Sequence, residues 1–317
     1  MSESQNAPKV FIVILNWNGL EDTLACLESL RHLDYLNYEV IVVDNDSADG
    51  SEEVLRQRYP QHIIIQSGAN LGFAGGTNVG LRYALEHGAD YAWLLNNDTL
   101  VEPDALTELV RRMQAKPGAG LCGSTLVYHH DRDKIQAYAG ATYNKWLSTS
   151  HHIGQDAPRY QARHQEGQEV DVQAVEEKLD YLVGASCLAS RPLLEEVGLM
   201  SEDYFLYYEE VDWATRAKGR YMLAFAPKSI VYHKEGGSIG SSSEGAKKSR
   251  LADYYGVRNR LLYTRIHAPE ALPSVYLGLL ITVANRVRRR QWARIPMILS
   301  LAWAGLRGRA KLERAKA

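Results

Sequence analysis

Short apolar runs alternate with segments of helical spacing along the first third of the chain. Four runs are short and rich in β-branched residues, as expected for strands covered on both faces: Val10–Leu15, Glu39–Val43, His62–Gln66 and Tyr91–Leu95. Four intervening segments predict helices: 20–33, 49–59, 77–86 and 103–115. Repeated βα units imply an α/β fold with a mainly parallel sheet and helices on both faces. Ligands bind beyond the carboxyl ends of such strands, so the residues just after each apolar run are the first candidates for a site.

The regular alternation is lost after residue 127. Residues 128–178 are polar and predict an irregular insertion or a hairpin. The pattern then predicts strands at 179–189, 222–226 and 229–232, a helix at 204–218, a Gly/Ser-rich loop at 236–245, and helices from Leu251 onward.

The composition is that of a globular protein. Hydrophobic residues make up 45% and charged residues 23% of the 317 residues, which excludes a disordered chain, a collagen-like fibre and a disulfide scaffold. The three cysteines are far apart and lack metal-ligand spacing, so we expect reduced thiols in a cytoplasmic protein. No signal peptide is expected, and the longest apolar runs (275–284 and 295–306) are shorter than the about 20 residues that a spanning helix needs.

Positive charge is concentrated at the end of the chain. The net charge is −2, but residues 258–317 hold 13 Lys and Arg against 2 Asp and Glu, a balance of +11. The preceding 257 residues hold 23 basic and 36 acidic residues, a balance of −13. A basic segment attached to an acidic body predicts an anionic surface as a partner.

Short amides, carboxylates and glycines follow each of the four predicted strands. The segments are Asn16–Gly19, Asp44–Ser51, Asn70–Gly80 and Asn96–Asp98. Ordinary turn chemistry explains any one of them, but all four would lie at one sheet edge. The first segment lacks the Gly-x-Gly-x-x-Gly turn of a nicotinamide-binding domain, and the chain has no Gly-x-x-x-x-Gly-Lys-Ser/Thr phosphate loop. Both nucleotide-binding interpretations are therefore weakened.

These segments and three later ones resemble the inverting family-2 glycosyltransferases, most closely the bacterial rhamnosyltransferase-like branch that builds surface polysaccharides. The similarity extends over about residues 9–265 and rests on seven motifs in the expected order. They are Asn16-Trp-Asn-Gly19, Val42-Val-Asp-Asn-Asp-Ser47, Asn70-Leu-Gly-Phe-Ala-Gly-Gly-Thr-Asn78, Leu94-Leu-Asn-Asn-Asp98, Gly184-Ala-Ser186, Phe205-Leu-Tyr-Tyr-Glu-Glu-Val-Asp-Trp213 and Val231-Tyr-His233.

The resemblance implies a GT-A fold and a metal-dependent inverting hexosyltransferase that uses a dTDP- or UDP-linked sugar, with a saccharide or lipid-linked acceptor. We expect a catalytic domain at 1–257, with a nucleotide-sugar-binding half at 9–126 and an acceptor half at 127–257, followed by a basic helical tail at 258–317. Two alternatives are a non-catalytic carbohydrate- or partner-binding relative and a sugar-nucleotide pyrophosphorylase. A pyrophosphorylase should carry a Gly-rich basic loop after the first strand, and none is present there.

The resemblance also implies where a donor and a metal would bind. Asp98 ends a buried strand and is the expected ligand of Mg²⁺ or Mn²⁺, although Asn96-Asn97-Asp98 keeps only one carboxylate of the Asp-x-Asp pattern that family members often show. His233 matches a second ligand and would favour Mn²⁺, or else it makes a structural hydrogen bond. Asp44 matches the position that accepts the N3–H of uracil or thymine, or is a turn residue. The remaining donor-side candidates are Asn16, Asn70, Gly75, Asn96, Asn97 and Arg258.

An inverting transfer needs one general base for the acceptor hydroxyl. The family's base aligns with Glu210, where Glu replaces the usual Asp, and Asp212 is the alternative. Both lie at the start of a predicted helix, where acids are common for electrostatic reasons alone. The acceptor-side candidates are Gly184, Ala185, Ser186, Glu209 and Trp213. Arg258 would hold a phosphate or begin the basic tail.

The tail admits three interpretations. Residues 272–306 mix apolar stretches with the arginines of 286–290 and with Trp292 and Trp303, which predicts a basic amphipathic helix on the inner face of the cell membrane. Nucleic-acid binding would also explain the arginines, but the apolar partners disfavour it. A helical hairpin packed on protein, or a homodimer contact, is the third interpretation.

Overall fold

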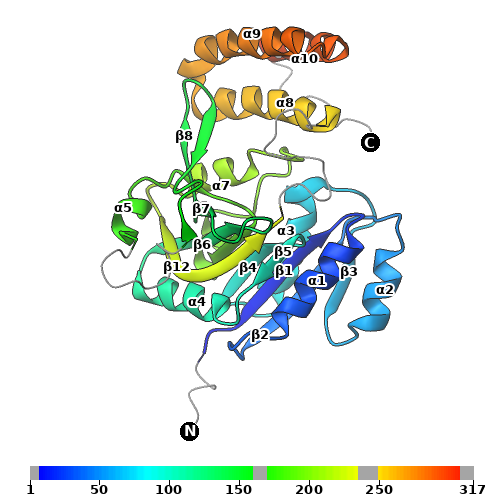
Figure 1. The fold of residues 1–317 in the computed structure, drawn as a ribbon, viewed down its shortest axis with the longest axis vertical. Helices are drawn as coiled ribbons and strands as arrows, with labels where there is room; N and C mark the ends of the chain where they lie inside the picture. Colours follow the sequence, from blue (N-terminus) through cyan, green and yellow to red (C-terminus); the bar gives the residue numbers. More distant parts are fainter. Residues whose placement is uncertain (1–6, 160–169, 235–248, 308–317) are drawn as a thin grey trace.

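The centre of the fold is one nine-stranded sheet, seen in a computed structural model that describes residues 7–159, 170–234 and 249–307 (Figure 1). The strand order is β3-β2-β1-β4-β11-β6-β12-β5, and β7 pairs with β6 outside this path. The strands are β1 (Val10–Asn16), β2 (Tyr38–Asp44), β3 (Ile63–Gln66), β4 (Tyr91–Asn96), β5 (Thr99–Val101), β6 (Ala119–Tyr128), β7 (Ile135–Tyr138), β11 (Ser186–Ser190) and β12 (Met222–His233).

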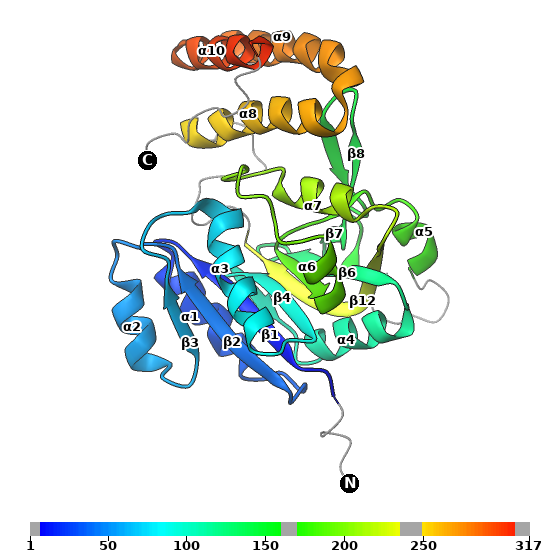
Figure 2. The same ribbon diagram turned by 180° about the vertical axis from the view of Figure 1, so that it is seen from behind.

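Helices cover both faces of this sheet, as the buried apolar runs predict (Figures 1 and 2). They are α1 (Leu20–Leu30), α2 (Ser51–Arg58), α3 (Gly72–Glu86), α4 (Ala105–Ala115), α6 (Arg191–Glu196) and α7 (Glu209–Ala217). Successive side chains of β1 point to opposite faces, so Ile12 and Ile14 pack with α1 and α4 while Phe11 and Val13 pack with α3. Two apolar cores therefore hold the sheet from its two sides.

The sheet is mixed, which corrects the expectation of a mainly parallel one. β1, β2, β3 and β4 are parallel, but β11 runs antiparallel to both β4 and β6. Ser186, the first residue of β11, lies opposite Leu95 near the end of β4. The antiparallel direction therefore places the turn before β11 at the same edge where the parallel strands end.

Two predicted helices differ from the observed ones at their starts. α3 begins at Gly72 rather than at residue 77, because its glycines allow it to lie close against the sheet: a Cβ on Gly76 would lie 2.4 Å from Leu15 Cδ1, and one on Gly80 would lie 2.4 Å from Val13 Cγ1. α7 begins at Glu209 rather than at residue 204. The predicted strands at 222–226 and 229–232 form one strand, β12, with an irregular register between Ala226 and Ile230.

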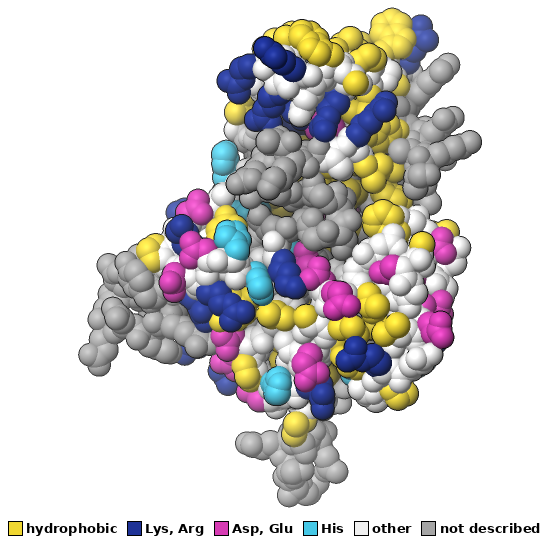
Figure 3. Space-filling view, turned by 45° about the vertical axis from the view of Figure 1, so that its right-hand side comes forward, with side chains coloured by type: hydrophobic (Ala, Val, Ile, Leu, Met, Phe, Trp, Pro, Cys, Tyr) yellow, Lys and Arg dark blue, Asp and Glu magenta, His cyan; other side chains and the backbone are white. Residues whose placement is uncertain are grey.

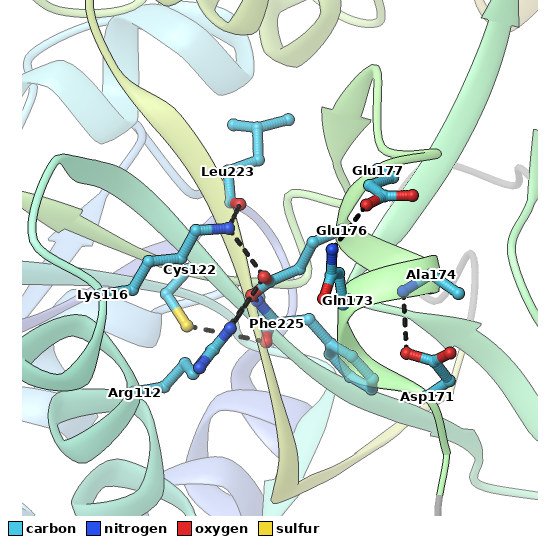
Figure 4. Close-up of polar contacts among 11 residues, drawn as sticks. Arg112, Lys116, Cys122, Asp171, Gln173, Ala174, Glu176, Glu177, Leu223 and Phe225 are labelled. Atoms are coloured by element: carbon cyan, nitrogen blue, oxygen red, sulfur yellow. Dashed lines mark hydrogen bonds and ion pairs between the residues drawn. The ribbon is translucent and has the colours of Figure 1, made fainter.

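The insertion predicted at 128–178 contains the expected hairpin. A three-stranded sheet is formed by β8 (Gly140–Asn144), β9 (Thr149–His152) and β10 (Tyr181–Leu182). The insertion also contains α5 (Val172–Glu176), which is anchored by Glu176 (Figure 4). The Glu176 carboxylate is 2.7 Å from Arg112 Nη2 and 2.6 Å from Lys116 Nζ, and it accepts the backbone N–H of Phe225 at 2.8 Å. One cation on α4, a second directly after it and one N–H on β12 thus fix a buried carboxylate.

Three C-terminal helices form a layer beyond α7 (Figures 1 and 2). They are α8 (Arg250–His267), α9 (Leu272–Arg288) and α10 (Ile295–Leu306), with single turns of 3-10 helix at Pro269–Ala271 and Trp292–Arg294. α8 crosses the predicted domain boundary at residue 258, and its Val257 and Leu261 pack against Val275 and Ile298. No helix in the described ranges is both long and apolar enough to cross a membrane. The predicted loop at 236–245 lies outside the described residues.

Candidate active site

A chain of buried hydrogen bonds joins three strand ends at one edge of the sheet. Asn97 Nδ2 donates to Thr23 Oγ1 at 3.0 Å, and Thr23 Oγ1 donates to Asn16 Oδ1 at 2.8 Å. Asn16 Nδ2 in turn donates to Asp44 Oδ2 at 2.8 Å. Asn16, Asp44 and Asn97 therefore meet as the sequence predicts. Thr23 was not predicted, because in the sequence it belongs to α1 and not to a segment that follows a strand.

Asp44 lies at the end of β2 with a fully buried side chain. Its Oδ1 accepts the backbone N–H of Ser47 at 2.9 Å and Gln66 Nε2 at 3.1 Å, in addition to the Asn16 bond to Oδ2. Three of about four lone-pair positions of a carboxylate are thus filled by the protein. A fourth acceptor position remains, but because the side chain is fully buried, a pyrimidine N3–H would reach it only after the surrounding residues move. The base-recognition role stays a prediction.

The glycine-containing segment beside Asp44 is a helix start. Asn70 Oδ1 accepts Asn45 Nδ2 at 3.1 Å and the backbone N–H of Gly72 at 3.0 Å. A Cβ on Gly75 would lie 2.8 Å from Leu71 Cβ, so this glycine relieves crowding at the helix start. The Phe73 N–H donates to the Phe205 carbonyl at 2.8 Å, which joins this segment to the loop before α7.

Asp98, in the turn between β4 and β5, faces His233 at the end of β12. His233 Nε2 lies 3.3 Å from Asp98 Oδ1, and both side chains are largely buried. On the other side of the ring, Nδ1 donates to Gln136 Oε1 at 3.0 Å. This bond leaves Nε2 directed at a carboxylate oxygen, an arrangement that a cation shared between the two side chains would stabilise. The pair therefore fits a metal site with two protein ligands and Gln136 orienting the histidine.

No cluster of three or more His, Cys, Asp or Glu residues suited to a metal occurs in the described part of the chain. A cation at Asp98 and His233 would consequently depend on ligand oxygens for the rest of its coordination, as Mg²⁺ and Mn²⁺ commonly do when they bind phosphates. Gln136 was not predicted, since it belongs to the insertion whose pattern was uninformative.

The predicted acceptor segment meets the Asp98 turn through the backbone. The Asn96 N–H donates to the Ala185 carbonyl at 3.1 Å, which places Gly184 and Ala185 next to the end of β4. Ser186 is fully buried and accepts Trp93 Nε1 at 2.9 Å. Ser186 therefore lies inside the sheet, while Gly184 and Ala185 lie at its edge.

Glu209 and Glu210 are the first residues of α7. Burial raises the pKa of the Glu210 carboxyl, although its own backbone N–H and that of Gly184 donate to it and oppose the rise. Burial, followed by the charge of Glu210, raises the pKa of Glu209 well above its usual value. Glu209 Oε2 is buried and has no hydrogen-bond partner. Two adjacent acids at a helix N-terminus thus lie in surroundings that disfavour a second negative charge.

A small cavity lies beside Glu210. Its lining is mainly apolar and comes from both halves of the sheet: Phe73, Leu94, Leu121, Leu182, Gly184, Cys187, Met200, Glu210 and Trp213. A Cβ on Gly184 would lie 2.5 Å from Glu210 Oε1, so only glycine leaves this carboxylate its position. Trp213 is buried, and its Nε1 donates to the Gly198 carbonyl at 2.8 Å. Its ring is part of the core and cavity wall.

Asp212 faces a different environment from Glu210. Arg216 Nε lies 2.7 Å from Asp212 Oδ2, and His267 Nε2 lies 2.7 Å from Asp212 Oδ1. Burial would raise the pKa of Asp212, but the hydrogen bonds from His267 and Arg216 outweigh it and hold the pKa below its usual value. Both carboxylate oxygens are occupied, one by Arg216 and one by His267, so Asp212 ties α7 to α8 and Glu210 is the better base.

The loop before α7 is strained and is held by α8. Tyr207 and Tyr208 have φ values of 69° and 77°, a region that bulky residues rarely adopt. Asn259 is fully buried, and its Nδ2 donates to the carbonyls of Leu206 at 2.8 Å and Tyr207 at 2.9 Å. The sequence pattern did not indicate this contact, because it depends on a helix 50 residues further along.

Arg258 acts on the same loop. Its Nη1 donates to the Asp203 carbonyl at 2.8 Å and to Asn259 Oδ1 at 2.6 Å. Burial lowers the pKa of its guanidinium group. Arg258 is therefore buried beside the loop that precedes the acids rather than on an exposed tail, and phosphate contact stays a prediction.

Sequence comparisons agree with these motifs. Residues 11–168 match the family model Glycosyl transferase family 2. The chain is 26% identical over 269 residues to the dTDP-rhamnosyl transferase RfbF of Shigella flexneri, covering 82% of this chain and 81% of that protein. It is 26% identical over 216 residues to the N-acetylglucosaminyl-diphospho-decaprenol L-rhamnosyltransferase of Mycobacterium tuberculosis, covering 63% and 68%. With the Haloferax volcanii hexosyltransferase Agl10 it shares 28% identity, over 65% of this chain and 61% of that protein.

Solved structures show the same fold. The mannosyltransferase PcManGT from Pyrobaculum calidifontis, solved with GDP-Man and Mn²⁺, superimposes with a TM-score of 0.56 at 16% identity, covering 96% of this chain and 89% of that one. TarS residues 1–349 from S. aureus give a TM-score of 0.56 at 14% identity, covering 95% and 82%. These likenesses establish the GT-A architecture. Together with the family match and the ordered motifs at one sheet edge, they show that the chain belongs to the family-2 glycosyltransferases.

Proposed function

We propose that the chain transfers a sugar of the rhamnose class, with inversion, from a dTDP- or UDP-linked donor to a saccharide or lipid-linked acceptor in the synthesis of bacterial surface polysaccharide. The names of its rhamnosyltransferase relatives support this substrate class. The observation that carries the reaction type is Glu210, a partly buried carboxylate held by a Gly184 N–H at the sheet edge where Asp98 also lies.

Glu210 is assigned as the general base. The acceptor oxygen attacks the anomeric carbon while the bond from that carbon to the diphosphate oxygen breaks, and the acceptor proton passes to the Glu210 carboxylate. A single displacement of this kind inverts the anomeric configuration. Partial burial raises the pKa of the Glu210 carboxyl, which makes the carboxylate a stronger base at neutral pH.

Asp98 and His233 are assigned as the ligands of a divalent cation, and imidazole favours Mn²⁺ over Mg²⁺. When bound, the cation would neutralise charge on the leaving diphosphate. Asn16, Asn97 and Thr23 position Asp44 and the Asp98 turn through their hydrogen-bond chain. Asp44 has one acceptor position left for the N3–H of uracil or thymine.

We also propose that the acceptor is presented at the inner face of the cell membrane, with which the chain associates peripherally. The +11 balance of residues 258–317 supports this location, because cytoplasmic leaflets are anionic.

Thermal unfolding with a panel of nucleotide sugars tests the proposal. A dTDP- or UDP-linked sugar with Mn²⁺ should raise the melting temperature, because a ligand that binds only the folded state stabilises it. Asp98→Ala should keep its fold but lose most of the Mn²⁺-dependent increase. A non-catalytic relative would bind the sugar without releasing nucleoside diphosphate, and a pyrophosphorylase would release the sugar phosphate in pyrophosphate. Either result would contradict the proposed reaction.

A further inference from the structure

The outer faces of α9 and α10, and of the 3-10 turn between them, are apolar and exposed. Side chains at helical spacing lie on the side turned away from the packed core of the C-terminal layer, and each is more than half exposed: Leu277, Leu280, Ile281, Trp292, Leu299, Trp303 and Leu306. The opposite faces of both helices, through Val275, Leu279, Ile298 and Leu301, pack together with α8. Figure 3 shows hydrophobic side chains gathered over the outermost helices, with basic side chains beside them. We call these seven residues the apolar face.

The arginines in this layer differ in their exposure to solvent. Arg286 Nη2 and Arg294 Nη1 each lie 2.6 Å from the buried carboxylate of Asp253, so these two hold the helices together. Arg288, Arg289 and Arg290 are exposed at the end of α9, and Arg307 is exposed after α10 with its guanidinium 4.5 Å from the Trp303 ring centroid. The exposed positive charge thus borders the apolar face.

A distant segment of the chain adjoins this surface. Trp146 and Leu147, at the tip of the β8–β9 hairpin, are 48% and 61% exposed. Ser274 Oγ at the start of α9 donates to the Trp146 carbonyl at 2.6 Å, and Lys145 Nζ lies 2.8 Å from Glu270 Oε1. The hairpin tip is therefore attached to the same helical layer, which the sequence pattern did not indicate.

We propose that the apolar face and the hairpin tip form one docking surface for an anionic lipid bilayer. This deepens the proposed function and rests on its lipid-linked acceptor. Exposed tryptophans beside leucines, bordered by arginines and with little free acidic charge, match the headgroup boundary of such a bilayer. A nucleic acid would use the arginines but would leave the seven apolar side chains in water, whereas a bilayer covers both.

The hairpin connects this surface to the active site. Next to the tip, the Tyr143 ring packs edge-on to Tyr208 and to Tyr263, at centroid distances of 6.2 and 5.2 Å. Ser148 Oγ lies within hydrogen-bond distance of both Tyr143 Oη (2.7 Å) and Tyr208 Oη (3.1 Å). Tyr208 immediately precedes Glu209 and Glu210. Docking at the tip would accordingly fix β8 and β9 and, through Tyr208, the start of the helix that carries Glu210. A lipid-linked acceptor would leave the bilayer close to this point.

Flotation of the full chain with vesicles, without any sugar substrate, tests the surface. The wild type should bind vesicles of mixed neutral and anionic phospholipid and should bind neutral vesicles much less. Replacing Arg288, Arg289 and Arg290 together by Gln should weaken binding roughly 100-fold, because each basic residue near an anionic surface contributes about fivefold. Leu280→Asp with Trp303→Asp, and separately Trp146→Ser with Leu147→Ser, should each lower binding at least about tenfold.

Matched controls are Leu36→Asp, an apolar residue outside the surface that is 78% exposed, and Arg31→Gln at the C-terminal end of α1. All variants should keep the melting temperature and the turnover of a short soluble acceptor. Vesicle binding that is equal in surface and control variants would overturn the proposal. So would sedimentation showing a wild-type dimer that the Leu280/Trp303 variant converts to monomer, because a second copy would then cover the face. Activity is measured separately, so an inactive chain that binds vesicles would contradict only the proposed function.

Discussion

Three carboxylates in the first turn of α7 occupy three different environments. Glu209 is buried with an oxygen that has no partner, Glu210 borders a small apolar cavity, and Asp212 is paired with Arg216 and His267. The motif already pointed to Glu210, but only the geometry explains why Asp212 is unsuitable. A carboxylate whose charge is stabilised by hydrogen bonds from two partners is a weaker base than one that burial destabilises.

Gly184→Ala should displace the Glu210 carboxylate without unfolding the protein. The new methyl group would overlap Glu210 Oε1, at the end of a flexible side chain that can rotate away. We expect kcat to fall at least about tenfold with little change in donor affinity, since misplacing a catalytic group is costly even over small distances. Gly256→Ala, where a Cβ meets nothing within 4 Å, is the control. Equal kcat values in the two variants would show that Glu210 is not the base.

The pH dependence follows from the same carboxylate. Glu210 accepts a proton only when ionised, and burial raises its pKa. Activity should therefore fall with decreasing pH through a midpoint above about 4.3, the ordinary value for glutamate. Measuring kcat/KM together with donor binding over the same pH range separates this loss from weaker donor binding. A midpoint at or below the ordinary glutamate value, with donor binding intact, would be inconsistent with a buried base.

At the scale of elements, the part of the site formed by the first parallel strands was the easiest to predict. The ends of β1, β2 and β4 come together because parallel strands share an edge, and the motif residues there lie as expected. The direction of β11 and the early start of α3 could not be predicted, since both depend on contacts between distant segments. Glycines that normally weaken a helix are favoured in α3 by its close approach to Leu15 and Val13.

The most distant of these contacts joins α8 to the loop that carries the acids. Asn259→Ala removes two hydrogen bonds to the strained backbone at Leu206 and Tyr207, so the loop should relax and Glu210 should lose its fixed position. We expect kcat to fall at least about tenfold, with donor affinity nearly unchanged. Each buried carbonyl left unpaired should also destabilise the fold by about 1–3 kcal/mol.

Thr264→Val provides a matched control for this prediction. Thr264 is buried on the same helix, and its hydroxyl donates to the Arg260 carbonyl at 2.8 Å without contacting the loop. This variant should lose some stability and keep its kcat. A similar drop of kcat in both variants would mean that α8 supports the site only through general stability.

At the scale of the whole molecule, the helices of the basic tail have one packed side and one exposed side. Residues of α9 and α10 pack onto α8 on one side and are exposed on the other, so packing on protein and exposure of an apolar face coexist. Charge counting could not separate Arg286 and Arg294, which pair with Asp253, from the exposed arginines. Sequence alone gives the sum of the charges, whereas their partners depend on the folded helices.

Deleting residues 272–317 should consequently destabilise the catalytic part. Val257 and Leu261 would become exposed, and Asp253 would lose both arginine partners. Removing the partners of a buried charge costs about 3–5 kcal/mol, although new exposure to water would reduce this. We expect the melting temperature measured by circular dichroism to fall by at least about 5 °C. An unchanged melting temperature would mean that the helical layer adds no stability to α8.

The central claim is that Glu210 deprotonates the acceptor in a transfer from a nucleotide sugar. The most direct measurement is the release of nucleoside diphosphate from a dTDP- or UDP-linked sugar in the presence of acceptor and Mn²⁺, by the wild type and by Glu210→Gln. Glutamine preserves the size of the side chain but cannot take the proton, so turnover should fall by roughly 10²-fold or more while donor binding is retained. Equal turnover by the two proteins would contradict the account.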